Sequence, residues 1–241
     1  MQESDIQIVA RNVLETLESY FRANNLSGSA LAFSGGLDST LLLKLSNLTL
    51  RPYTVGVKGS VDIKNAEEAA DILQVNARIV VIDDDDIRNY AGIVKKIDPD
   101  IGINDLGYET VFAAVLDNID ERRLVTGQGS DEIFYGYRKF SDGRESSNFS
   151  SLEKLSRVTL PRERRIAEYF GKEVRMPYLE AGIQNLPAAM SREMNLREGG
   201  NKVILREAAT MAGLPPELVR RAKKAAQYGS GVMKVIRRLE L

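Results

Sequence analysis

A short apolar run that ends at two glycines constrains the fold of this chain more than any other feature. Residues 29–33 read Ser-Ala-Leu-Ala-Phe, and Ser34, Gly35 and Gly36 follow at once. This pattern predicts a buried strand that enters a tight turn. A helical pattern over residues 38–48 comes directly after the turn. A strand that passes through glycines into a helix is typical of the first half of a βαβ unit.

The alternation of strand and helix continues along the chain and predicts an α/β fold: a mostly parallel sheet with helices on both faces. Beyond residue 152 only helical patterns are visible, which predicts a helical C-terminal part. We therefore expect a single domain over residues 1–241, with a core over residues 27–139 and a helical part over residues 152–241. The further strands are expected over residues 53–57, 77–82 and 123–126, and the further helices over residues 6–24, 63–73, 84–96 and 109–118.

Three residue types are missing from the 241 residues: Cys, His and Trp. Without Cys or His the chain has no disulfide, thiol nucleophile, imidazole base or zinc site of the usual kind. Its chemistry must use carboxylates, Lys, Arg, Tyr, hydroxyls, backbone amides and a hard cation held by oxygens. No apolar run reaches 18 residues and the first ten residues lack a signal-peptide pattern, so we expect a cytoplasmic protein without a membrane partner.

The charge is divided unevenly. Residues 1–150 carry 15 Lys and Arg against 24 Asp and Glu, whereas residues 151–241 carry 18 against 10. A basic half indicates a polyanion nearby, which could be phosphate, nucleic acid or the acidic half itself.

The glycine turn is a predicted phosphate site. The amides of glycines can approach an anion closely, and the start of the following helix favours negative charge. The hydroxyls of Ser34, Ser39 and Thr40 add donors. Asp38 would repel a phosphate unless a cation such as Mg²⁺ lay between them. The alternative interpretation is a simple helix cap, with Ser34 or Asp38 as the N-cap.

Four segments carry a resemblance to a known family. Residues 33–40, FSGGLDST, resemble the PP-loop of the N-type ATP pyrophosphatases and lack the Lys of a Walker loop. Residues 126–137, TGQGSDEIFYGY, are similar to the SGEGSDEhFxGY of asparagine synthetases (h is apolar), and residues 173–180, EVRMPYLE, to their ExRxPFLD. Lys202-Val-Ile-Leu-Arg206, Arg221-Ala-Lys223 and Gly229-Ser-Gly231 match the K-x-x-L-R and R-x-K…G-x-G of the same family. These motifs follow one another in the order that is typical of the asparagine synthetase family. The chain therefore resembles the synthetase domain of that family, standing alone without the glutaminase domain.

The resemblance implies an adenine nucleotide alpha hydrolase-like fold and an ATP-dependent ligase that forms AMP and pyrophosphate. A carboxylate would attack the α-phosphate, and an amine would then displace AMP. Asp38 and Asp131 would hold Mg²⁺, Lys223 would stabilise charge near the α-phosphate, and Gln128 and Asp131 would complete the catalytic set. The residues implied for ATP and pyrophosphate are Ser34, Gly35, Gly36, Asp38, Ser39, Thr40, Ala32, Val55 and Gly127.

Each of these assignments has a structural alternative. Asp131 could be the N-cap of a helix, and Ala32, Val55 and Gly127 could simply belong to the core. Lys223 lies in a run of charges over residues 220–224, and such runs are usually solvated. Glu173 and Arg175 could pair, either beneath the pocket or on the surface.

The chain departs from the family in three respects. Gln128 replaces a Glu, and a carboxamide can orient an attacking amine by hydrogen bonds but cannot accept its proton. Residues 108–112 lack the S-x-P-x-Y expected near an amino-acid pocket. With no glutaminase domain, the amine would be free ammonia, ammonia from a separate glutaminase chain, or another amine. Aspartate and ammonia are the first acid and amine to consider; the oligomeric state stays open.

Two other functions compete with a ligase. The chain could be a non-catalytic subunit that binds ATP or AMP and partners a separate glutaminase chain. It could also be a PP-loop enzyme that adenylates a tRNA base. The tRNA function is the least favoured, because no patch of interleaved Arg and aromatic residues is visible.

Overall fold

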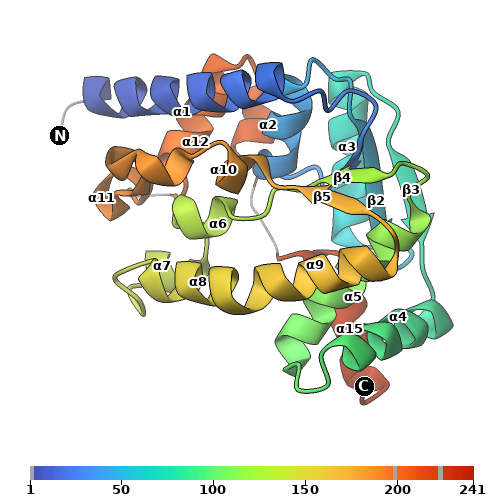
Figure 1. Cartoon of the computed structure of the whole chain (residues 1–241). Helices are drawn as coiled ribbons and strands as arrows, with labels where there is room; N and C mark the ends of the chain where they lie inside the picture. Colours follow the sequence, from blue (N-terminus) through green and yellow to red (C-terminus); the bar gives the residue numbers. More distant parts are fainter. Residues whose placement is uncertain (1–2, 198–199, 222–224) are drawn as a thin grey trace.

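Five parallel strands form the central sheet of this protein (Figure 1). The computed structural model describes residues 3–197, 200–221 and 225–241. The order across the sheet is β3-β2-β1-β4-β5. The strands are β1 (Ala30–Ala32), β2 (Arg51–Gly56), β3 (Arg78–Val81), β4 (Arg123–Val125) and β5 (Glu173–Arg175).

Helices make up most of the rest of the described chain, and each helix expected from the sequence is present. The longer ones are α1 (Glu3–Ala23), α2 (Leu37–Leu45), α3 (Val61–Leu73), α4 (Asp84–Ile97), α5 (Ile103–Asn118), α9 (Leu160–Tyr169), α12 (Val203–Met211) and α15 (Val232–Arg238). The short ones are α6 (Ser130–Ile133), α7 (Arg138–Ser141), α8 (Phe149–Lys154), α10 (Pro177–Glu180), α11 (Arg192–Asn195), α13 (Pro216–Val219) and α14 (Ala226–Gly229). A π-helical turn over Leu155–Thr159 joins α8 to α9, and 3₁₀ turns span Ile183–Asn185 and Pro187–Met190. No helix of the described residues is long and apolar enough to cross a membrane.

Two hydrophobic cores lie on the two faces of the sheet. One core contains Leu31 and Val125 together with the apolar faces of α1, α2 and α12. The other contains Ala30 and Leu124 with those of α4, α5 and α15. Neighbouring residues of a strand point to opposite faces, so β1 and β4 each supply both cores. The arrangement confirms the predicted α/β fold with helices on both faces of a parallel sheet (Figure 1).

The expectation that the part beyond residue 152 contains no strand is wrong. β5 pairs with β4 in parallel, with Val174 beside Leu124. This strand has only three residues, of which two are charged, and it lies at the edge of the sheet, where side chains can stay half-exposed. A three-residue edge strand shows no readable apolar pattern in the sequence.

The order of the strands places a ligand crevice between β1 and β4. The chain runs outward from β1 to β2 and β3, and then returns to the other side of β1 to form β4 and β5. In open parallel sheets, ligands bind beyond the carboxyl ends of the strands where the order reverses. Gly35 and Gly36 follow β1, and Gly127 follows β4, so all three lie at this reversal.

Replacing Gly35 by Ala tests how tightly the turn after β1 is constrained. Gly35 has φ +65°, and a Cβ there would collide with the backbone of Asn65. Gly59 has φ +73° with nothing within 4 Å of an added Cβ. Gly59→Ala should therefore lower the free energy of unfolding by about 1–2 kcal/mol, which is the cost of holding an alanine in the left-handed conformation. Gly35→Ala should cost clearly more, as measured by urea denaturation; equal losses would show that the close approach to Asn65 is unimportant.

Candidate active site

A cavity of about 880 Å³ opens over the carboxyl ends of β1, β2 and β4. It is lined on one side by the segments that follow these strands and on the other by residues of α5, α8 and α9. Most of the predicted site residues line it: Ala32, Ser34, Gly36, Asp38, Ser39, Val55, Gly127, Gln128 and Asp131. Gly35 makes the turn behind the lining, and Thr40 is fully buried in α2, outside the cavity wall.

The turn after β1 presents backbone donors at the start of α2. Gly36, not Ser34 or Asp38, is the N-cap, and no side chain caps the helix. The interpretation of this segment as a Ser or Asp cap is therefore wrong. The first amides of α2 have no carbonyl partner within the helix, and together with the helix dipole they favour an anion. The Ser39 hydroxyl stays close, donating to the Gly36 carbonyl at 3.3 Å.

Residues from the distant motifs hold this turn in place. The Arg221 guanidinium donates to the carbonyls of Gly35, at 3.1 Å, and Asn65. The Tyr178 hydroxyl donates to the Asp38 carbonyl at 3.0 Å. Residues that lie more than 130 positions further along the chain thus fix the turn between β1 and α2. The sequence motifs alone do not reveal these contacts.

Lys202 connects the two predicted metal ligands. Its Nζ lies 2.6 Å from Asp38 Oδ1, 2.7 Å from Asp131 Oδ1 and 2.9 Å from Ser130 Oγ. Ser130 Oγ in turn donates to Asp38 Oδ1 at 2.9 Å. The Lys202 side chain is only 3% exposed, so its charge is balanced by the two carboxylates that face it.

The two carboxylates therefore converge on one cation position. Asp131 lies in the first turn of α6, whose N-cap is Gly129, so Asp131 is not itself a cap. The described residues contain no cluster of three or more acidic side chains arranged to hold a metal. Two carboxylates fit Mg²⁺ when substrate phosphates and water supply its remaining ligands. Asp38 and Asp131 are the residues that would hold it.

Sequence reasoning did not assign a role to Lys202. The residue belongs to the K-x-x-L-R segment, but its ammonium is found between Asp38 and Asp131 only in the fold. A lysine that directly precedes the apolar positions Val203, Ile204 and Leu205 could have indicated a buried charge.

Ala32, Val55 and Gly127, the residues expected near adenine and ribose, line the cavity and also pack against the protein interior. Val55 is 3% exposed and packs in the core beside α4 and α5, yet it also lines the cavity. Ala32 is half-buried, and Gly127 lies against Asp38, so that an added Cβ would crowd the Asp38 side chain. A small residue at Gly127 keeps this part of the crevice open.

Gln128 is held at both ends of its carboxamide. Its Nε2 donates to Glu163 Oε1 at 2.7 Å, and its Oε1 accepts from the Tyr108 hydroxyl at 3.2 Å. Glu163 comes from α9, and sequence reasoning missed it because it lies in a charged stretch that resembles a solvated face. Gln128 is thus part of a fixed chain of three polar side chains beside the cavity.

Two buried glutamates lie in this region. Glu109 on α5 is fully buried, and Glu163 is 1% exposed. Burial raises the pKa of Glu109 to about 8, with a further increase from Asp105 and Asp98 and an opposing effect from Arg162. Burial, and then the charge of Glu109, raises the pKa of Glu163 well above its ordinary value. The Glu109 carboxyl therefore tends to keep a proton near neutral pH.

Of the remaining predicted residues, Lys223 lies outside the described residues, whereas Glu173 and Arg175 can be placed. Glu173 and Arg175 have different partners: Glu173 pairs with Arg122 and Arg123, and Arg175 pairs with Glu180 at 3.0 Å. The side chains of these pairs are partly or largely exposed, which favours a structural role at the edge of the sheet.

The sequence model of the asparagine synthase family matches residues 28–163 and 147–239 of this chain. The chain belongs to that family. It is similar to the putative glutamine-hydrolyzing asparagine synthetase 1 of Methanocaldococcus jannaschii, with 27% identity over 260 residues covering 89% of this chain and 48% of that protein. It is also similar to the probable glutamine-hydrolyzing asparagine synthetase of Acanthamoeba polyphaga mimivirus, with 31% identity over 162 residues covering 61% of this chain and 30% of that protein.

Among solved structures, the NMN synthetase of Francisella tularensis aligns over 98% of this chain and 86% of its own, with 12% identity and a TM-score of 0.45. The chain spans less than half the length of the two asparagine synthetases it matches. Family membership makes it an asparagine synthetase-like domain of the ATP-utilising kind.

Replacing Lys202 by Met tests the shared cation position. Loss of the ammonium leaves two buried carboxylates facing each other, so the free energy of unfolding should fall by about 3–5 kcal/mol. Added Mg²⁺ should stabilise Lys202→Met more than the unchanged chain, because the ammonium no longer competes for Asp38 and Asp131. Thermal unfolding with and without MgCl₂ measures both effects, and Lys234→Met, at an exposed lysine, is the control. Equal Mg²⁺ effects on both proteins would argue against a common site.

The raised pKa of Glu109 predicts a specific pH dependence of stability. Below its ordinary pKa near 4.5 the carboxyl is protonated in the folded and the unfolded chain alike. Between that value and about 8 the folded chain keeps a proton that the unfolded chain has lost, so stability falls as the pH rises, by at most ~1.4 kcal/mol per pH unit. Urea denaturation should show the unchanged chain losing stability relative to Glu109→Gln as the pH rises across this range. A difference that stays constant with pH would contradict the shift.

Proposed function

We propose that this chain is an ATP-dependent ligase domain that joins a carboxylate to an amine, forming AMP and pyrophosphate. The observation that carries the proposal is the convergence of Asp38 and Asp131 on one cation position, 2.6 and 2.7 Å from Lys202 Nζ. The two residues come from the segments after β1 and β4, on either side of the strand-order reversal. The first amides of α2, which have no carbonyl partner within the helix, belong to the same segment as Asp38.

Different residues of the cavity would bind the two halves of ATP. The amides at Gly36 and in the first turn of α2, with the hydroxyls of Ser34 and Ser39, would bind the pyrophosphate. Adenine and ribose would lie against Ala32, Val55 and Gly127, which line the cavity. Mg²⁺ held by Asp38 and Asp131 would neutralise charge that develops on the phosphates.

The cationic side chains complement this arrangement. The ammonium of Lys202 supplies a fixed positive charge at the same place. Lys223, outside the described residues, is proposed from the family resemblance as the lysine near the α-phosphate. Gln128 would orient the attacking amine by accepting one of its N–H groups at the second lone pair of Oε1, whose first accepts from Tyr108.

Several relatives are described as glutamine-hydrolyzing asparagine synthetases, so aspartate and ammonia are the first acid and amine to test. The ammonia could come from a separate glutaminase chain.

A pyrophosphate-release assay tests the ligase. The chain with ATP and Mg²⁺ should release pyrophosphate and AMP in equal amounts with at least one member of a panel of acids and amines. Asp38→Asn and Asp131→Asn should each lower the rate at least ~100-fold, a typical cost of removing one electrostatic stabiliser of a transition state. Asp71→Asn, at an exposed position of α3, is the matched control. Absence of both pyrophosphate release and ATP binding would overturn the proposal.

A second candidate function is a non-catalytic subunit that binds ATP or AMP and partners a glutaminase chain. The fixed position of Gln128, between Tyr108 and Glu163, favours it, because a carboxamide held in this way cannot accept a proton from an amine. The same assay separates the two functions. The subunit predicts nucleotide binding without turnover and no gain from Gln128→Glu, whereas turnover by the isolated chain would exclude it.

A further inference from the structure

A second cavity, of about 1220 Å³, adjoins Asp131. It is lined by residues of α6, α7, α11 and α12 and of neighbouring loops; Figure 1 shows α6, α7 and α11 on the opposite side of the molecule from α4. We call it the arginine cavity, because its wall contains five arginines: Arg138, Arg192, Arg197, Arg206 and Arg220. Among the described residues of this wall, Asp131 is the only acidic one, and it already pairs with Lys202 at 2.7 Å. The cavity therefore has a surplus of positive charge.

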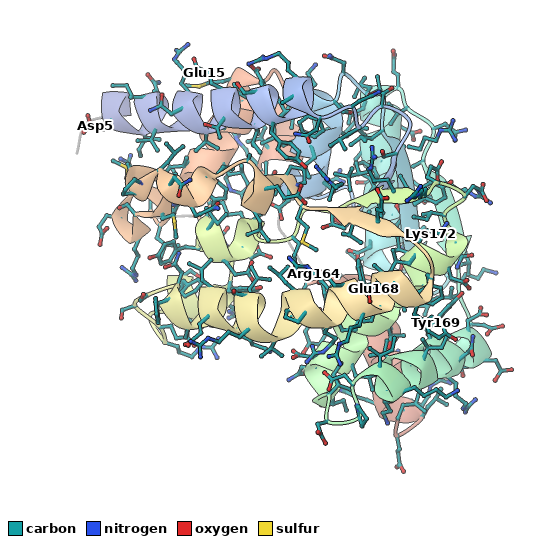
Figure 2. The ribbon with its side chains drawn as sticks, viewed as in Figure 1. Asp5, Glu15, Arg164, Glu168, Tyr169 and Lys172 are labelled. Carbon is teal, nitrogen blue, oxygen red and sulfur yellow. The ribbon has the colours of Figure 1, made fainter. Side chains whose placement is uncertain are left out.

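Two of these arginines lack the counter-charge that other arginines of similar burial have. Charged side chains are usually exposed, as Figure 2 shows for Glu15 on α1 and Arg164 on α9. Arg192 and Arg206 are half-buried and form no ion pair with the described residues. The other described arginines that are not exposed each pair with a carboxylate: Arg123, Arg162, Arg175 and Arg221. The two exceptions both line the arginine cavity.

The Arg206 guanidinium has only neutral hydrogen-bond partners among the described residues. Its Nε donates to the Asn201 carbonyl at 2.9 Å, its Nη2 to Asn201 Oδ1 at 3.5 Å, and its Nη1 to the Val219 carbonyl. Burial lowers the pKa of Arg206 below its ordinary value, against an opposing effect from the charge of Asp38. A half-buried cation without a counter-charge is unfavourable, so an anion that enters the cavity would stabilise it.

Arg192 has fewer contacts still. Its Nη2 donates to the Phe140 carbonyl at 3.4 Å, and its Nε is fully buried without a hydrogen-bond partner among the described residues. A guanidinium carries five N–H donors, and buried donors are normally satisfied. Because Arg192 forms part of the wall, an anion in the cavity can supply acceptors to this guanidinium.

The wall favours a ligand with several anionic oxygens. The planar guanidinium matches the oxygens of phosphate through paired, charge-assisted hydrogen bonds. The five arginines come from separate places in the fold: α7, α11, the segment after α11, α12 and the segment after α13. A single carboxylate or orthophosphate offers acceptors to one or two of them. A pyrophosphate offers two linked phosphoryl groups and more negative charge.

The arginine cavity borders the cavity that contains the phosphate-binding turn. Asp131, Tyr137, Arg138 and Ala225 line both. Since Asp131 is one of the two carboxylates that would hold Mg²⁺, the arginine cavity begins beside the proposed position of the phosphates. In the proposed reaction, the adenylate stays in the first cavity after pyrophosphate has been expelled. Pyrophosphate that moves into the arginine cavity therefore leaves without passing the adenylate.

We propose that the arginine cavity is a second anion site, which binds the pyrophosphate released from the phosphate-binding turn. Arg192 and Arg206 would donate to its oxygens, and the exposed Arg197 and Arg220 would contact it where the cavity meets solvent. The proposal rests on the proposed function in naming this anion as the product of the reaction. The binding itself requires neither ATP nor turnover.

A solvated basic surface is the alternative explanation for the arginines. It accounts for Arg138, Arg197 and Arg220, which are exposed. It does not account for Arg192 and Arg206, which are half-buried without a counter-charge among the described residues. A solvated surface would bind anions weakly and lose them in salt, because exposed charges are screened.

Calorimetry with inorganic pyrophosphate tests the site. The full chain is first saturated with Mg²⁺ and α,β-methylene-ATP, which cannot be cleaved between its α and β phosphates and occupies the first cavity. It should still bind pyrophosphate in about 0.15 M NaCl, where the charges of a solvated surface are screened. The affinity should exceed that for orthophosphate at least ~10-fold, because a second phosphoryl group adds charge-assisted hydrogen bonds.

Two outcomes of this titration would overturn the proposal. One is loss of pyrophosphate binding in the presence of the analogue, which would leave a single phosphate site. The other is equal, weak binding of pyrophosphate and orthophosphate. Failure of the analogue itself to bind would count against the proposed function, and the variants below would still locate the pyrophosphate.

Variants locate the site. Arg192→Gln should weaken pyrophosphate binding about tenfold or more, because it removes charge-assisted hydrogen bonds, and should leave the affinity for α,β-methylene-ATP unchanged. The double variant Arg197→Gln, Arg220→Gln changes only exposed side chains, so it should fold, and it should also weaken pyrophosphate binding. Arg164→Gln, at an exposed position of α9, is the control.

Unchanged pyrophosphate binding in both arginine variants would place the anion elsewhere and refute the assignment. Pyrophosphate binding that depends on these arginines, without turnover of ATP, would leave the site in place and count against the ligase alone.

Discussion

The ammonium of Lys202 is the contact on which the arrangement of the cavity depends. It lies between Asp38, at the start of α2, and Asp131, in α6, and it also contacts Ser130. Because these groups are largely buried, removing one of them leaves the charge of the others uncompensated. The single cluster therefore fixes the segment before α12 against the two segments that flank the strand-order reversal.

The geometry of the turn between β1 and α2 follows from the same constraint. Asp38 can approach Lys202 only if α2 begins close to the sheet, which requires the left-handed turn at Gly35. Gly136 has a similar role, since an added Cβ there would strike the Asp131 carboxylate and the Lys202 side chain. Arg221 then secures the turn from the other side through the Gly35 carbonyl. Small residues and one buried cation thus hold two acidic side chains where a phosphate-bound metal could use them.

The acidic side chains of the cavity are stabilised in two different ways. The carboxylates of Asp38 and Asp131 are balanced by Lys202 and by the dipole of α2. Around Glu109 and Glu163, Arg162 is shared among several acids, and burial raises the pKa of both glutamates. The first pair is therefore stabilised by neighbouring positive charge, whereas burial favours the protonated form of the second.

That Asp38 and Asp131 belong to one site was implied by the family resemblance. The sequence by itself determined the parallel α/β sheet and the glycine turn after β1. These features depend on local patterns: apolar runs of strand length, glycines at strand ends and helix periodicity. Only the tertiary structure decided the position of Lys202, the edge strand β5, and the contacts of Gln128 with Tyr108 and Glu163. These depend on which distant segments meet. A charged residue in a helical stretch gives the same local signal whether it faces water or a cavity, and only packing distinguishes the two.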